Sequence, residues 1–225
     1  MIPIITIDGP SGAGKGTISQ RVAESLGWHM LDSGSLYRLT ALAATLDGID
    51  LANEQALADL AIKLDVVFEP AGDGLKILLR GEDVSAAIRV EAIGMKASKV
   101  AALPAVRAAL LTRQRDFALA PGLVADGRDM GTTVFPQAGL KIFMTASAEA
   151  RAERRYKQLM EKGFGASLPA LVADLKARDE QDSQRSVSPL MPAPDAILLD
   201  TTLMSIEDVT KQVLTRAKNI YRQAE

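Results

Sequence analysis

GPSGAGKGT, residues 9–17, decides the fold of this 225-residue chain. It matches the pattern G-x-x-x-x-G-K, followed by Gly-Thr, and stands between an apolar run at 2–7 and a helical pattern at 18–26. Glycines let the backbone turn tightly and point its N–H groups at phosphate oxygens, and a helix start adds partial positive charge. Lys15 adds a full charge and Thr17 a hydroxyl for Mg²⁺. A glycine-rich turn that merely contains a lysine is the alternative, but the strand–loop–helix context favours a phosphate-binding loop.

The composition narrows the class of protein. Hydrophobic residues make up 48% of the chain, enough for a large buried core, and the absence of cysteine excludes disulfides and Cys-ligated metals. A net charge of −2 argues against nucleic acid polymers and anionic membranes as partners. We find neither a membrane-length apolar stretch nor a signal-peptide pattern and expect a cytoplasmic protein. The single histidine, His29, has apolar neighbours and is predicted to be structural.

Apolar runs and helical patterns alternate, which predicts an α/β fold with a parallel sheet covered by helices. The expected strands are residues 2–7, 28–31, 123–125, 140–144 and 196–199. Ligands of such sheets bind beyond the carboxyl ends of the strands. The glycine loop and the turns at 32–34 and 126–129 are therefore expected to converge on one cleft.

Two segments interrupt the alternation. Strand-like runs at 65–69 and 75–79, separated by the turn residues 70–74, predict a hairpin within an insert of about 34–98. Residues 161–167 form a glycine-containing joint between two helical patterns. A mobile cover over phosphates and an ordinary surface turn are both compatible with this joint.

Basic residues gather on several predicted elements. One predicted helix carries Arg151, Arg154, Arg155 and Lys157, the next pattern carries Arg178 and Arg185, and Arg107 and Arg128 stand elsewhere. Solvated helix faces and ion pairs within a helix would explain each run alone. Beside a phosphate loop, several separate arginines are what phosphoryl transfer requires, because they stabilise the charge of the moving group. A phosphate acceptor is already mostly anionic at pH 7 and needs no general base.

Further motifs carry a resemblance to a known family. DSGSLYR at 32–38, DGRDMGT at 126–132 and Val134-Phe135-Pro136 resemble the bacterial cytidylate kinases, which are P-loop nucleoside monophosphate kinases. GEDVS at 81–85 and Arg178-Asp179-x-x-Asp182 fit the same family. The resemblance implies a P-loop three-layer fold with a five-stranded parallel sheet, an inserted monophosphate-binding subdomain with antiparallel strands, and a short helical lid. The implied division is core at 1–33, 99–150 and 168–225, insert at 34–98 and lid at 151–167.

The resemblance also implies transfer of the γ-phosphoryl group of ATP to CMP or dCMP with Mg²⁺. It gives the ATP site as Gly9, Pro10, Ser11, Gly12, Ala13, Gly14, Lys15, Gly16 and Thr17 with Arg151 and Arg154. It gives the CMP site as Ser33, Tyr37, Arg38, Ser98, Arg107, Arg128, Asp129, Arg178 and Asp182. The implied catalytic residues are Lys15, Arg128, Asp129, Arg155 and Arg178; Arg154 or Arg155 would be the lid arginine, and Arg151 would stack on adenine. Thr17, and Asp126 through water, would hold the metal. No nucleic acid polymer and no membrane is expected as a partner, and the chain is expected to be a monomer.

The base preference has a physical basis. Cytosine presents an exocyclic amine that a carboxylate accepts, whereas uracil presents an oxygen that a carboxylate repels. We therefore interpret Asp129 and Arg107 as the pair that reads cytosine, with structural ion pairs as the alternative for both. Two other functions stay open: another small-molecule P-loop kinase, and a nucleotide-binding module without turnover.

Overall fold

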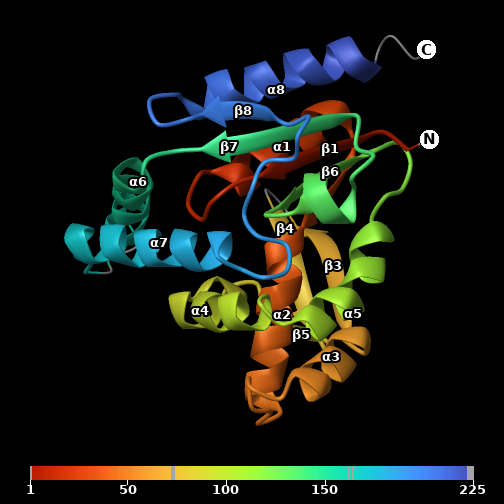
Figure 1. Cartoon of the computed structure of the whole chain (residues 1–225), viewed down its shortest axis with the longest axis vertical. Helices are drawn as coiled ribbons and strands as arrows, with labels where there is room; N and C mark the ends of the chain where they lie inside the picture. Colours follow the sequence, from red (N-terminus) through yellow and green to blue (C-terminus); the bar gives the residue numbers. More distant parts are fainter. Residues whose placement is uncertain (1, 72–73, 162, 164, 222–225) are drawn as a thin grey trace. The chain divides into compact units, whose positions relative to one another are not determined.

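The computed structural model describes residues 2–71, 74–161, 163 and 165–221 (Figure 1). The chain divides into two compact units. The core unit comprises residues 1–32 and 115–225, and the inserted unit comprises residues 33–114.

A five-stranded parallel sheet forms the core unit, in the order β2-β6-β1-β7-β8. Its strands are β1 (Ile4–Asp8), β2 (His29–Asp32), β6 (Leu123–Gly127), β7 (Leu140–Thr145) and β8 (Ile197–Asp200). Each lies within two residues of its predicted position, which confirms the predicted fold class. The register sets Asp8 of β1 beside Gly127 of β6, so the glycine loop and the 126–132 segment leave the sheet side by side.

The helices of the core unit are α1 (Lys15–Leu26), α6 (Ala148–Glu161), α7 (Leu168–Ser183) and α8 (Ile206–Tyr221), with a π-helical turn η2 (Met130–Val134). Gly14 and Gly27 flank helix α1, and both have left-handed backbone conformations. The predicted joint separates α6 from α7 and contains Gly163 at φ 76°, while Lys162 and Phe164 lie outside the described residues.

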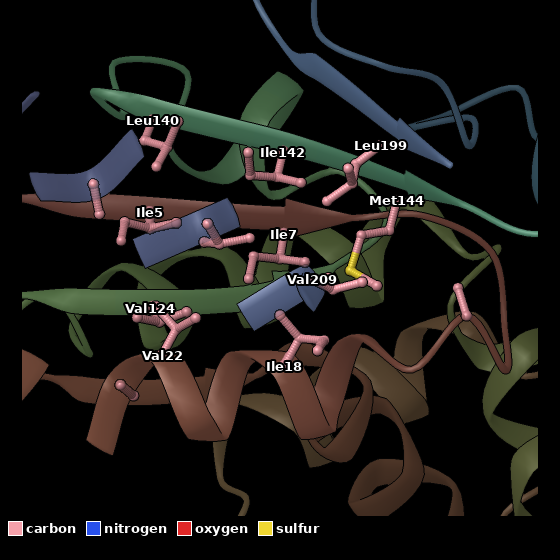
Figure 2. Packing of buried hydrophobic residues seen from close by; sticks show 14 residues of the cluster. Ile5, Ile7, Ile18, Val22, Val124, Leu140, Ile142, Met144, Leu199 and Val209 are labelled. Atoms are coloured by element: carbon pink, nitrogen blue, oxygen red, sulfur yellow. The ribbon is translucent and has the colours of Figure 1, made fainter. Parts of the chain in front are cut away.

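Alternating side chains of the sheet build the main core. Ile5 and Ile7 of β1 point toward α1, which contributes Ile18 and Val22 to the same cluster (Figure 2). Helix α8 adds Val209 and two further residues, so α1 and α8 cover the same face of the sheet. Burial of these apolar side chains fixes β1 and α1, and with them the loop that joins the two.

The inserted unit contains helices and a small antiparallel sheet. Its elements are α2 (Ser33–Leu46), α3 (Glu54–Ile62), β3 (Val66–Ala71), β4 (Gly74–Leu79), β5 (Glu82–Asp83), η1 (Ala87–Arg89), α4 (Glu91–Val100) and α5 (Pro104–Arg115). The predicted hairpin is present as β3 and β4, while Gly72 and Asp73 of its turn lie outside the described residues. This unit has its own core around Leu39, Ile77, Leu79 and Ile88.

Within the described ranges, no helix has the length and apolarity needed to cross a membrane.

Candidate active site

The glycine loop is held closely against the sheet. Gly9 has φ 147°, and a Cβ atom at this position would lie 2.1 Å from the carbonyl oxygen of Met144 on β7. Only glycine fits here, because a carbonyl fixed in a central strand cannot move aside. The Nζ of Lys15 turns back over the loop and donates to the Pro10 carbonyl at 2.9 Å. The chain therefore presents a preformed loop with the lysine inside it.

Gly9→Ala should lower the free energy of unfolding by about 3–5 kcal/mol, because the new methyl group overlaps the Met144 carbonyl. The matched control is Gly14→Ala in the same loop, where φ is also positive but no atom lies within 4 Å of the added methyl. This control should cost about 1–2 kcal/mol for backbone strain alone. Denaturant unfolding of both variants measures the difference, and equal losses would contradict the tight fit at Gly9.

Lys15 and Asp126 form a buried pair at the ends of adjacent structural elements. The Nζ atom lies 3.9 Å from Oδ1 of Asp126, and both side chains are at most one-tenth exposed. Burial, followed by the nearby charge of Arg128, lowers the pKa of Lys15. Burial raises the pKa of Asp126 against the opposing charge of Lys15. Such shifts are typical of functional sites, where charges are held together in advance of a ligand.

Oxygen donors beside this pair fit a hydrated Mg²⁺ ion. Thr17 is exposed at the start of α1, and Oδ2 of Asp126 lies 3.5 Å from where a Cβ of Gly16 would stand. No group of three or more His, Cys, Asp or Glu residues suited to a metal occurs in the part of the chain that the structure describes. Mg²⁺ at a nucleotide site is usually held by one or two protein oxygens, water and phosphate, and these residues match that pattern.

Asp8 is a second buried carboxylate, at the last position of β1. Its Oδ1 and Oδ2 accept hydrogen bonds from the backbone N–H groups of Met130 and Gly131, each at 2.8 Å. Burial raises the pKa of Asp8 from 3.8 to about 6, although the two N–H groups favour the charged form. The carboxylate thus joins the strand before the glycine loop to the turn that follows β6.

Because the pKa of Asp8 is raised by folding, the contribution of this group to stability depends on pH. Between about pH 4 and 6 the folded protein keeps a proton that the unfolded chain releases, so this group's contribution to stability falls as pH rises. The free energy of unfolding of wild type minus that of Asp8→Asn should fall by about 3 kcal/mol from pH 4 to pH 7, since the subtraction cancels the other carboxylates. Denaturant titrations at several pH values measure this difference. A difference that stays constant or rises with pH would contradict the assignment.

Asp182 brings two arginines together. Its Oδ2 accepts from Nε of Arg128 at 3.0 Å, and its Oδ1 accepts from Arg185. The sequence placed Arg185 on a helix with Arg178, but α7 ends at Ser183 and Arg185 lies beyond it. Arg178 stands on α7 as predicted. A carboxylate that is 1% exposed therefore orients guanidinium groups from two distant segments.

The arginines of α6 have different surroundings. Arg151 is buried and donates to the Ser11 carbonyl of the glycine loop at 2.9 Å and to Asp179 of α7. Arg154 donates to the Thr201 carbonyl at 2.5 Å, and the half-buried Arg155 is the next residue along. Arg151 thus ties α6, α7 and the glycine loop together, while its stacking on adenine and the lid role of Arg154 or Arg155 stay predictions.

The inserted unit groups its own predicted site residues. Nη1 of Arg107 donates to the Ala101 carbonyl at 2.9 Å, and the guanidinium lies 5.5 Å from the ring centre of Tyr37. Arg38 lies against Gly94, and the carbonyl of Gly94 accepts from Ser98 at 3.3 Å. The remaining member, Ser33, donates to Gln114 at 2.8 Å. Binding of CMP by these residues stays a prediction.

Comparison with known proteins decides the family. Residues 5–219 match the family model described as cytidylate kinase. The chain belongs to the cytidylate kinase family.

Relatives in the cytidylate kinase family align with nearly the whole chain. It is 57% identical over 221 residues to a cytidylate kinase of Photobacterium profundum, covering 98% of this chain and 97% of the relative. It is 61% identical over 215 residues to one of Pseudomonas syringae pv. tomato, covering 95% and 94%. A crystal structure of a gluconokinase from Sinorhizobium meliloti 1021 is similar over 99% of this chain and 98% of its own, with 15% identity and a TM-score of 0.47, too low to inform function.

Sequence reasoning did not assign Asp8 and Asp179 to the site, and it named Arg185 only as one of several separate arginines, without a role of its own. Each of the three contacts a segment of the predicted site: Asp8 contacts Met130, Asp179 contacts Arg151, and Arg185 contacts Asp182. The motifs alone do not reveal these pairs. Asp179 and Arg185 offered a signal, because they stand within or just after the Arg178-Asp179-x-x-Asp182 motif. Asp8 offered only its place directly before the first glycine.

Proposed function

We propose that this member of the cytidylate kinase family transfers the γ-phosphoryl group of ATP to CMP or dCMP, giving ADP and CDP or dCDP. One observation carries the proposal. The buried Nζ of Lys15 lies inside the glycine loop, 2.9 Å from the Pro10 carbonyl, and Asp182 holds Arg128 at the end of the strand next to β1, so cations from separate segments are fixed before any ligand binds. Cations that are positioned in advance stabilise the negative charge of a phosphoryl group as it passes between two nucleotides.

The donor side uses the start of α1. The N–H groups of the glycine loop and the Nζ of Lys15 would bind the β- and γ-phosphates of ATP, whose negative charge stabilises the charged form of the lysine. Thr17, and Asp126 through water, would hold Mg²⁺. When bound, Mg²⁺ neutralises charge on the β- and γ-phosphate oxygens.

The acceptor side uses arginines and no general base. A phosphate oxygen of CMP attacks the γ-phosphorus, the bond from that phosphorus to the β–γ bridging oxygen breaks, and ADP leaves with the electron pair. The acceptor phosphate is mostly dianionic at pH 7, so no proton has to be removed. Arg128 and Arg178 would hold the acceptor phosphate, Asp182 would keep Arg128 oriented, and Asp129 would accept from the cytosine amine.

Further parts of the proposal concern setting and partners. The enzyme would work on free nucleotides in the cytoplasm as a monomer, with no nucleic acid polymer and no membrane as partner. The net charge of −2 supports the exclusion of anionic polymers and surfaces.

An acceptor panel tests the function. Formation of ADP from ATP is measured with CMP, dCMP, UMP, AMP, GMP, unphosphorylated cytidine and no acceptor. We expect turnover with CMP and dCMP, at least about 100-fold slower reaction with UMP, and almost none with cytidine or without acceptor. Cytidine as the best acceptor would favour a different small-molecule kinase. Absence of ADP with every acceptor would favour a binding module without turnover.

A further inference from the structure

The turn that follows β6 is stabilised by a side chain from a different strand. It carries Arg128 and Asp129 and opens the short η2 helix, whose first N–H groups have no partner within the helix. Asp129 occupies the N-cap position, yet its side chain makes no capping hydrogen bond. The cap comes instead from Asp8, more than 120 residues away in the sequence, which accepts from both Met130 and Gly131. The residue predicted to read cytosine is therefore not the residue that holds the turn in place.

The same turn lies directly on β1. A Cβ atom on Gly131 would stand 2.9 Å from Oγ1 of Thr6 and 3.4 Å from Oδ2 of Asp8. Only a residue without a side chain lets the backbone approach β1 this closely. The backbone pairing of Asp8 with Gly127 adds a second attachment between the two strands.

We propose that Asp8 is a positioning residue, which fixes the turn carrying Arg128 and Asp129 in register with the phosphate loop that begins at the next residue. This inference rests on the proposed function, because it assigns the turn to the acceptor nucleotide and the loop to ATP. By accepting hydrogen bonds from two successive N–H groups of the turn, the carboxylate fixes the position of Asp129 relative to the phosphate loop. The position of CMP relative to ATP would follow from this.

The chemistry of a carboxylate explains why aspartate stands at this position. The two carboxylate oxygens accept from two N–H groups at once, so two hydrogen bonds hold the turn. An amide has one oxygen and one NH₂ group, so asparagine would set a donor against one of the two N–H donors. A buried carboxylate also costs stability at neutral pH, which is typical of groups retained for function rather than for folding.

Asp8→Asn tests the inference, because it keeps the size of the side chain and loses one of the two hydrogen bonds. We expect the KM for CMP to rise about tenfold to 100-fold and the CMP-over-UMP preference to fall by a similar factor. Affinity for a non-hydrolysable ATP analogue without acceptor should change less than about threefold, since the phosphate loop keeps its own contacts. The backbone amide NMR signals of Met130 and Gly131 should shift in the nucleotide-free protein.

The matched control is Thr6→Val, on the same strand and against the same turn. The Thr6 hydroxyl is buried without a hydrogen-bond partner, so its removal should leave KM, base preference and both amide signals unchanged. Gly131→Ala is a second test, because it displaces the turn by the overlap with Thr6 while leaving the carboxylate in place. It should reproduce the pattern of Asp8→Asn in KM and base preference.

Several outcomes would overturn the inference. An Asp8→Asn variant with wild-type KM and base preference but lower thermal stability would make Asp8 a structural cap only. Equal losses of ATP-analogue and CMP affinity would also contradict it, because the effect would not be confined to the turn. If the wild-type protein fails to phosphorylate CMP, the proposed function fails by itself. Unchanged Met130 and Gly131 amide signals in Asp8→Asn would refute the placement of Asp8 whatever the activity.

Discussion

Lys15→Met is expected to lower kcat for phosphoryl transfer to CMP about 10³-fold while the protein stays folded. The ammonium group lies inside the glycine loop, where it would meet charge that develops on the transferred group. Methionine keeps most of the aliphatic volume and removes the charge together with the hydrogen bond to the Pro10 carbonyl. The loss should persist at saturating ATP and CMP, because the interaction is stronger in the transition state than in the ground state.

The control for this variant is Arg21→Met on the same helix. Arg21 is about half exposed and pairs with Glu207 on α8, away from the glycine loop. Its removal should leave kcat within about twofold of wild type, because exposed ion pairs contribute little. The coupled assay for ADP gives both values, and thermal unfolding verifies the fold. A Lys15→Met enzyme that keeps a tenth or more of wild-type kcat would contradict the role of the lysine.

Asp129→Ala is expected to reduce the preference for CMP over UMP by about 100-fold. The carboxylate would accept from the cytosine amine and repel the uracil oxygen, so its removal both weakens CMP and relieves the penalty on UMP. The ratio of kcat/KM for the two acceptors, measured in the same preparation, reports the change free of error in enzyme concentration.

The same ratio should be measured for Arg107→Ala, because Arg107 is the second member of the proposed pair. Arg107 also contacts Ala101 and the Tyr37 ring within the inserted unit, so some loss of stability should accompany any change in base preference. An unchanged CMP-over-UMP ratio in both variants would refute the assignment and leave both residues structural.

The sequence predicted those features that depend on local pattern. Apolar runs located all five strands of the parallel sheet, because buried strands are read from hydrophobicity alone. Lys15, Thr17 and Asp126 were predicted as site residues because each stands at a fixed place in a motif or at a strand end. The hairpin of the inserted unit followed from its turn residues.

Features that depend on contacts between distant segments were not predictable in the same way. The partners of Asp8 lie 122 and 123 residues away, and Arg151 meets Ser11 across 140 residues. The predicted insert ended at about residue 98, whereas the compact inserted unit extends to residue 114 and includes Arg107. Arg185 was assigned to a helix because its polar surroundings continue the helical pattern past Ser183.

Binding of a bisubstrate, in which adenosine and cytidine are joined by five phosphates, tests most directly whether two polyanionic nucleotides are held end to end by Lys15 and Arg128. Calorimetry should show wild-type affinity at least about 100-fold above that for ATP or CMP alone, because one linked ligand avoids the second loss of translational freedom. Lys15→Met and Arg128→Met should each weaken this binding about 100-fold. The account would be contradicted if the bisubstrate bound no more tightly than ATP and if neither Lys15→Met nor Arg128→Met changed its affinity.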